Sequence, residues 1–188
     1  MRDLFRSTTL AAALVVAGAA SVLADDTVCY GNLSGSHTNV IVPEGGACNI
    51  SNARIQGNVE VKSGAGLTVQ GPVYIGGNVQ SESGRYVRLQ GSGVTVNGNV
   101  QLKYVTGASG MQPGTQVRGN FQYEENQGFL FVSGSFIRGD FQMFKNSGGA
   151  SITNNTIRQN MQCKENYPPP SGGGNVVGGN KEDQCSGL

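Results

Sequence analysis

Residues 55–60 read IQGNVE, residues 75–80 read IGGNVQ and residues 96–101 read VNGNVQ. These segments belong to a longer series, because an Asn, or once an Asp, recurs every 19 to 21 residues through most of the chain. The series consists of Asn39, Asn58, Asn78, Asn99, Asn120, Asp140, Asn160 and Asn180. A fixed period of this length is typical of a solenoid, in which each repeat stacks on its neighbours.

Each repeat predicts short strands that meet at a Gly-Asn corner. Glycine precedes the Asn in six repeats, and an apolar residue follows it in seven. The position three before it is β-branched in seven consecutive repeats: Ile55, Ile75, Val96, Val117, Ile137, Ile157 and Val177. Alternating apolar and polar residues put one face of each strand inside, and glycine tolerates a tight bend. A second glycine and a further apolar strand complete the repeat, so we expect three strands and three corners.

Three strands in one repeat make one coil of a parallel β-helix, with successive coils stacked roughly 4.8 Å apart. We therefore predict an all-β fold, a right-handed parallel β-helix of about seven coils of 19–21 residues. The 30 glycines, and the lack of a helical apolar period after the N-terminus, argue against a helical solenoid. We interpret the Asn column as structural, because stacked amide side chains can hydrogen-bond to the coils above and below.

The N-terminal segment, residues 1–24, differs from the repeats. Arg2 and Arg6 precede an apolar run at 10–20, and small residues follow up to Ala24. This pattern is typical of a secretory signal peptide, and the run is too short to span a bilayer. We predict cleavage after Ala24 and an exported protein, extracellular or at the cell surface, without a membrane span. The segment holds two arginines and one acid, so the rest of the chain has a formal net charge of zero. A neutral chain has no overall field that attracts nucleic acid, and we expect no nucleic-acid partner.

The four cysteines form two pairs near the ends of the exported chain. Cys29 and Cys48 are 19 residues apart and Cys163 and Cys185 are 22 apart, which is about one coil in each case. Residues stacked on adjacent coils are close enough for a disulfide, so we predict the bonds Cys29–Cys48 and Cys163–Cys185.

These bonds would hold the two ends of a single β-helix domain over residues 25–188, with an N-terminal cap at about 25–50 and a C-terminal cap at about 163–188. No C-x-x-C spacing occurs and His37 is the only histidine. The cysteines are therefore not expected to bind a metal.

The alternating strands and the repeated Gly-Asn-Val core resemble known families. The pattern is similar to the right-handed β-helix of pectate-lyase-like proteins, and the Gly-Asn-Val core resembles that of bactofilins. The C-terminal stretch, with CKEN at 163–166 and GNKEDQC at 179–185, looks like that of small secreted proteins without an assigned function. The resemblance implies a fold and assigns no activity.

An enzyme is the least favoured function class. A polysaccharide lyase would need clustered carboxylates for calcium and a base, and a hydrolase would need paired carboxylates. The acids of this chain are scattered: Asp140 replaces one Asn of the series, and Glu124 and Glu125 lie near a turn. We expect no catalytic residue, no cofactor and no metal, and we keep a polysaccharide lyase or hydrolase as the weakest alternative.

Two outward-facing columns flank the corner. They are Arg118, Arg138 and Arg158 before it, and Gln122, Gln142 and Gln162 after it. Successive guanidinium groups suit a linear acidic polysaccharide. Alternatively, the Arg stems cover the corner and the Gln side chains hydrogen-bond to each other. Our leading hypothesis is a secreted structural or surface-interaction solenoid without catalytic activity, whose partner is an extracellular polysaccharide or a cell-surface component. Binding of acidic polysaccharide by the Arg/Gln columns is the alternative.

Overall fold

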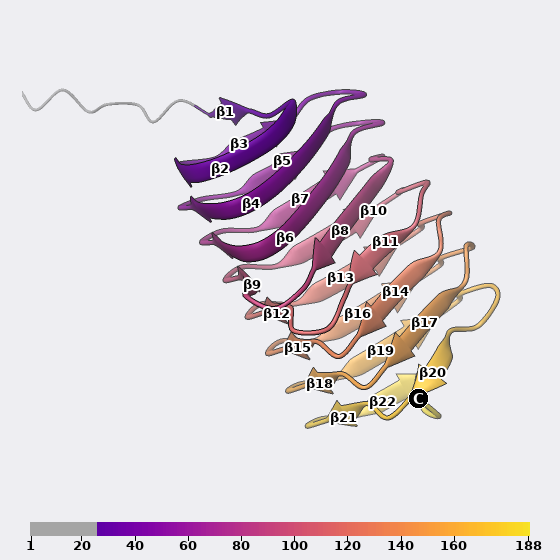
Figure 1. Cartoon of the computed structure of the whole chain (residues 1–188). Helices are drawn as coiled ribbons and strands as arrows, with labels where there is room; N and C mark the ends of the chain where they lie inside the picture. Colours follow the sequence, from indigo (N-terminus) through magenta and orange to yellow (C-terminus); the bar gives the residue numbers. More distant parts are fainter. Residues whose placement is uncertain (1–25) are drawn as a thin grey trace, which may run out of the picture.

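The computed structural model describes residues 26–188, and every regular element in this range is a β-strand. The strands wind into a parallel β-solenoid of about eight turns, close to the predicted seven (Figure 1). The predicted signal peptide at 1–24 lies outside the described residues. All strand pairs within this range join successive turns, so the fold is held together by neighbour-to-neighbour contacts along one axis.

One strand of each turn lies in a nine-stranded parallel sheet, which we call sheet A. Each of its strands begins directly after a residue of the Asn/Asp series or, in the case of β1, after Asp26. In order along the axis they are β1 (Thr27–Val28), β3 (Val40–Val42), β5 (Val59–Val61), β7 (Val79–Glu82), β10 (Val100–Lys103), β13 (Phe121–Glu124), β16 (Phe141–Phe144), β19 (Met161–Lys164) and β22 (Lys181–Asp183).

The remaining strands form a 13-stranded sheet, sheet B, which covers the other two sides of the solenoid. The first three turns contribute one long strand each: β2 (Gly31–His37), β4 (Ala47–Ile55) and β6 (Gly66–Ile75). Each later turn contributes two short strands. They are β8 (Tyr86–Gln90) and β9 (Val94–Val96), β11 (Ser109–Met111) and β12 (Gln116–Val117), β14 (Leu130–Ser133) and β15 (Phe136–Ile137), β17 (Ala150–Thr153) and β18 (Thr156–Ile157), and β20 (Ser171–Gly173) and β21 (Val176–Val177).

The prediction of three strands per coil therefore holds from β8 onward, whereas the first turns bend one continuous strand. A single residue in the left-handed region produces each bend: Gly35 (φ 92°), Asn52 (φ 47°) and Gly71 (φ 77°). One such residue redirects the chain while the hydrogen bonds on both sides persist. Between β8 and β9 several residues form the corner, and the strand is interrupted there.

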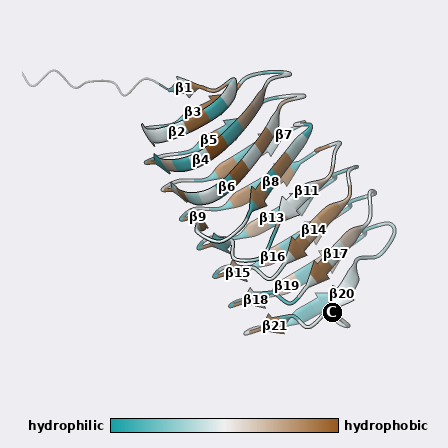
Figure 2. Cartoon of the chain, viewed as in Figure 1, coloured by the Kyte–Doolittle hydropathy of each residue, from teal (hydrophilic) through white to brown (hydrophobic). Residues whose placement is uncertain are grey.

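The core consists of stacked columns, as the period predicts. The β-branched residues pair turn by turn, from Ile55 with Ile75 to Ile157 with Val177. All are at most 1% exposed except Val177 in the last turn, which is half-buried. The apolar residues after the corner form a second buried column. Figure 2 shows the resulting alternation of hydrophobic and hydrophilic residues along the strands.

The predicted Asn ladder is present at the corner between sheet B and sheet A. Each ladder residue accepts, through Oδ1, a hydrogen bond from the backbone N–H of the ladder residue one turn later, at 2.8 to 3.0 Å. Asp140 fits the series because only the side-chain oxygen is used, and it accepts from Asn160 at 2.9 Å. Asp26 extends the ladder by one turn, since Asn39 Nδ2 donates to Asp26 Oδ1 at 2.9 Å.

Glycine precedes six of the eight ladder residues, with Thr38 and Gln159 as the exceptions, and space favours it there more than backbone conformation does. None of the six glycines has a positive φ. An added Cβ at any of them would lie 2.0 to 2.4 Å from the Oδ1 of the preceding ladder residue. At Gly57, for example, it would lie 2.0 Å from the Oδ1 of Asn39. Glycine thus leaves room for the hydrogen bond on which the ladder depends.

Two further amide ladders run inside the solenoid, and neither was predicted from the sequence. One joins Asn126, Asn146 and Asn166 and ends on Gln184, with donor–acceptor distances of 2.8 to 3.0 Å. The other joins Ser135, Asn155 and Asn175. The amides also donate to backbone carbonyls, such as Asn146 Nδ2 to Tyr123 O at 3.2 Å. These two ladders occupy only the later turns. Each contains too few residues to appear as a period along the whole chain.

The two predicted disulfides are confirmed. Cys29 and Cys48 have Cα atoms 5.6 Å apart, and Cys163 and Cys185 have Cα atoms 5.1 Å apart. Each bond joins neighbouring turns at one end of the described solenoid. The ends therefore gain covalent support where strands have a neighbour on one side only.

A third regular feature lies just after the strands of sheet A, where one residue per turn has a left-handed conformation. In two early turns the left-handed residue is a glycine one register position later, Gly45 (φ 66°) and Gly64 (φ 65°). Later turns use other residues: Ser83, Tyr104, Glu125, Lys145 and Glu165, with φ between 53° and 61°. A left-handed conformation costs a residue other than glycine roughly 1–2 kcal/mol.

Lys145→Gly is therefore expected to stabilise the protein by roughly 0.5–1 kcal/mol, after the entropic cost of glycine is deducted. The Lys145 side chain is exposed, so its loss removes no packing. Urea unfolding measures the change. Lys164→Gly, in the regular strand β19, is the matched control and should destabilise. Equal effects of the two substitutions would contradict this account of the left-handed position.

Candidate functional site

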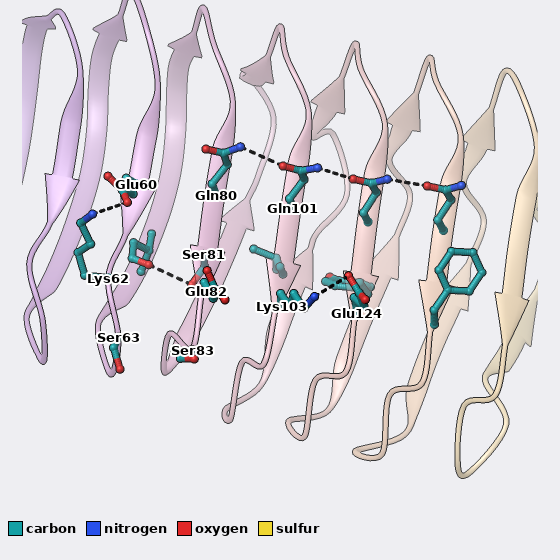
Figure 3. Close-up of a pocket in the computed structure, with 16 residues that line it drawn as sticks. Glu60, Lys62, Ser63, Gln80, Ser81, Glu82, Ser83, Gln101, Lys103 and Glu124 are labelled. Atoms are coloured by element: carbon teal, nitrogen blue, oxygen red, sulfur yellow. Dashed lines mark hydrogen bonds and ion pairs between the residues drawn. The ribbon is translucent and has the colours of Figure 1, made fainter.

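The outer face of sheet A carries a row of Gln side chains, which we call the Gln row. It consists of Gln80, Gln101, Gln122, Gln142 and Gln162 and ends on Glu182. Each Nε2 donates to the side-chain oxygen one turn later at 2.6 to 2.9 Å. Figure 3 shows the part of the row that begins at Gln80 and Gln101 as a line of hydrogen-bonded side chains across the strands. All donors point the same way along the axis, because the terminal Glu182 carboxylate can only accept.

Two residues further along each strand is a second row, the charged row. Its members alternate in sign over four turns: Lys62, Glu82, Lys103 and Glu124. Lys103 Nζ lies 3.3 Å from Glu124 Oε2, and this hydrogen bond raises the pKa of Lys103 above its ordinary value of 10.5. Lys62, directly after β5, forms an ion pair with Glu60 of β5. These exposed pairs contribute little to stability.

The two rows line a shallow, open groove of about 690 Å³ that runs from β5 to β16 (Figure 3). Its lining consists of amides, hydroxyls and charges of both signs, with the Phe144 ring at one end. The charged row was not predicted from the sequence, although it lies at a fixed distance from the Asn ladder. The Arg and Gln columns each repeat one residue type, whereas this column alternates between two.

The predicted Arg column lies on the other side of the ladder, at the ends of strands in sheet B. Arg118, Arg138 and Arg158 are all exposed and occupy successive turns. Arg118 Nη1 donates to Asn97 Oδ1 at 3.4 Å, and the Arg158 guanidinium lies 5.6 Å from the centre of the Phe136 ring. Neither of the two ion pairs found among residues 26–188 includes these arginines.

The Arg column and the Gln row are separated by the Gly-Asn corner. The groove on sheet A is lined by Gln122 and Gln142, but by none of the three arginines. The hydrogen bonds predicted along the Gln side chains are confirmed, so each amide is already committed in part to its neighbours. The protein thus presents two distinct periodic faces.

The other candidate groups are engaged in local contacts. His37 Nδ1 lies 3.1 Å from Thr27 Oγ1 and its Nε2 lies 3.0 Å from Ser34 O. Asp140 belongs to the ladder. Within residues 26–188, no group of three or more His, Cys, Asp or Glu residues is placed to hold a metal ion. No helix in the same range is long and apolar enough to cross a membrane.

Comparison with known proteins adds no assignment: no family model, curated protein or solved structure matches this chain. The fold and the two faces are therefore the basis for any statement on function.

Proposed function

We propose that this protein is an exported, rigid interaction scaffold without catalytic activity. The observation that carries the proposal is that outward side chains at equivalent positions line up over successive turns. The Gln row shows this most clearly. A stacked solenoid presents such groups at a constant spacing of roughly 4.8 Å. The corner ladder, the two interior amide ladders and the two disulfides tie the turns together and support a stiff platform. Disulfides are also typical of an oxidising, extracellular environment.

The finer likeness to pectate-lyase-like proteins and to bactofilins remains a prediction and carries no part of this proposal. The test is to incubate the purified protein with a panel of linear polysaccharides, neutral and acidic. Both retention on the immobilised polymer and the release of new chain ends are scored. A scaffold retains polymer and releases no product. Product that increases in proportion to the protein concentration would contradict the proposal.

A second candidate function, binding of a linear acidic polysaccharide, is supported by the Arg column. Three exposed guanidinium groups on successive turns form a positive row without nearby acid partners among the described ion pairs. Guanidinium groups bind carboxylate or sulfate groups with two parallel hydrogen bonds. The Phe136 ring beside Arg158 adds an apolar surface for a sugar ring. A repeating anionic chain laid along the axis would meet one arginine per turn.

Replacing Arg118, Arg138 and Arg158 together by Gln is expected to abolish retention on acidic polysaccharide without loss of the fold. Wild-type retention should fall steeply with salt, because binding depends on charge contacts that salt screens. Affinity electrophoresis in acidic polysaccharide measures both effects. The matched control replaces Lys62, Lys103 and Lys164 by Gln, which removes the same charge from sheet A. Equal loss in the two triple variants would indicate a general charge effect and would refute the Arg column as the site.

A further inference from the structure

The charged row of sheet A has a sequence of charges that is complementary to itself when reversed. From β5 to β13 it reads plus, minus, plus, minus, in the order Lys62, Glu82, Lys103 and Glu124. Read backwards, every plus coincides with a minus. Two copies of the same solenoid also share the same spacing between turns, so opposite charges stay aligned over all four positions.

We propose that two copies of this protein pair face to face through the outer surface of sheet A, with their axes antiparallel. The two-fold axis lies in the plane of the interface, between β7 and β10. In this arrangement Lys62 is opposite Glu124 of the second copy, and Glu82 is opposite Lys103 of the second copy. Each ion pair occurs twice, as in any interface built from the same patch on both subunits.

The positions flanking the charged row match in the same register. Pro43 precedes Lys62 in this column, because Val42 pairs with Val61, and it meets Phe144 of the second copy. One turn earlier is Tyr30, which is 71% exposed. It meets Lys164 of the second copy, and an ammonium group near a tyrosine ring is a favourable contact. Thus Phe144, the uncharged residue between Glu124 and Lys164, lies opposite Pro43, which is also uncharged.

The charge pattern excludes neighbouring registers. A shift by one turn sets Glu82 against Glu82 of the second copy, or Lys103 against Lys103, and these like charges repel. A shift by two turns leaves only one kind of opposite-charge pair. In a parallel arrangement, with the two-fold axis along the solenoid, each charged residue lies opposite the same residue of the second copy. These like charges repel. The antiparallel register is therefore the one that satisfies the whole row.

The Gln row and the ion pairs within one copy are compatible with this interface. Gln80 faces Gln101 of the second copy, and Glu60 faces Gln122. Each Gln uses one amide hydrogen within its own row and retains another for its partner. The paired side chains Lys62, Glu60, Lys103 and Glu124 remain 37 to 47% exposed. Glu82 takes part in neither of the two ion pairs among the described residues.

A second copy fits this face better than an acidic polymer does. Glu82 and Glu124 would repel a polyanion, whereas a copy of the row meets every charge with its opposite. The inference concerns a different face from the Arg column and does not depend on polysaccharide binding.

The experiment is sedimentation of the purified protein at roughly 0.02 M and roughly 0.5 M salt, where screening differs strongly. A dimer is expected at low salt and a monomer at high salt. Lys103→Glu, and separately Glu82→Lys, should each raise the dimer dissociation constant by about tenfold or more, since each creates two like-charge contacts. Arg118→Glu, on the other face, is the control and should dimerise like the wild type.

The decisive sample is an equimolar mixture of the Lys103→Glu and Glu82→Lys proteins. Across the interface every charge of one variant then meets an opposite charge of the other, so mixed dimers should form although neither variant dimerises alone. Circular dichroism of each variant establishes that it is folded. A wild-type protein that is monomeric at low salt overturns the proposal, as does a mixture that stays monomeric. If the protein is monomeric and a neutral polysaccharide binds to this face, the proposal is also overturned, and the face is assigned to that ligand.

Discussion

Val117→Asp is expected to leave the chain unfolded. Val117 is 0% exposed and stacks between Val96 and Ile137 in the β-branched column. A carboxylate there would lie among aliphatic side chains without a cationic partner, at a cost of several kcal/mol or more. The whole stability of a domain is only about 5–15 kcal/mol. Far-ultraviolet circular dichroism and urea unfolding measure the outcome.

The control for this variant is Arg118→Asp at the next position. Its side chain points outward and is exposed, so the same new carboxylate stays in water. This protein should retain the native spectrum and unfold cooperatively. A Val117→Asp protein with an unchanged urea midpoint would refute the assignment of this column to the core.

Asn146→Ala is expected to destabilise the protein by roughly 3 kcal/mol or more, because it interrupts a buried ladder. Both the backbone N–H and the Nδ2 of Asn126 donate to Asn146 Oδ1, each at 2.9 Å. Alanine leaves the Asn126 backbone N–H without an acceptor, and it leaves one of the two Nδ2 hydrogens unpaired, since the other donates to Leu102 O at 2.9 Å. Both groups lie in an interior where Asn126 is 0% exposed and Asn146 is 1% exposed. Each unsatisfied buried donor costs about 1–3 kcal/mol.

Asn99→Ala gives the comparison within the same fold. Asn99 belongs to the corner ladder and accepts from the Asn120 backbone N–H at 2.8 Å, but it is only partly buried. Water can replace the lost acceptor there, so the expected loss is about 1 kcal/mol. Urea midpoints and slopes of the two variants provide the test. Similar losses at the two sites would show that burial does not set the strength of these ladders.

The sequence predicts which residues form the Arg and Gln columns of the candidate site. It does not predict how these columns are arranged relative to each other. The Arg and Gln columns were identified because each repeats one residue type at a fixed distance from Asn120, Asp140 and Asn160. Their separation by the corner was not visible, since two residues before and two after the ladder read as neighbours in sequence. The charged row, with Glu82 between Lys62 and Lys103, becomes meaningful only when the strands are stacked in register.

The sequence by itself determined the period, the two buried columns, the corner ladder and the pairing of Cys29 with Cys48 and of Cys163 with Cys185. The period, the columns and the corner ladder follow from periodicity alone, because residues one period apart must stack on adjacent turns in any solenoid. The cysteine pairing needs only that each pair lies about one turn apart, since Cys48 is in register with Gly31 and Cys163 with Asp183. The tertiary structure decided the bent strands β2, β4 and β6, the inclusion of Asp26 in the ladder and the interior amide ladders. It also decided which outward rows share a face, and it showed that space favours glycine before six of the ladder residues. All of these depend on how the three sides of a turn close around the core. Contacts between different sides of a turn do not repeat at the period, so the sequence pattern does not reveal them.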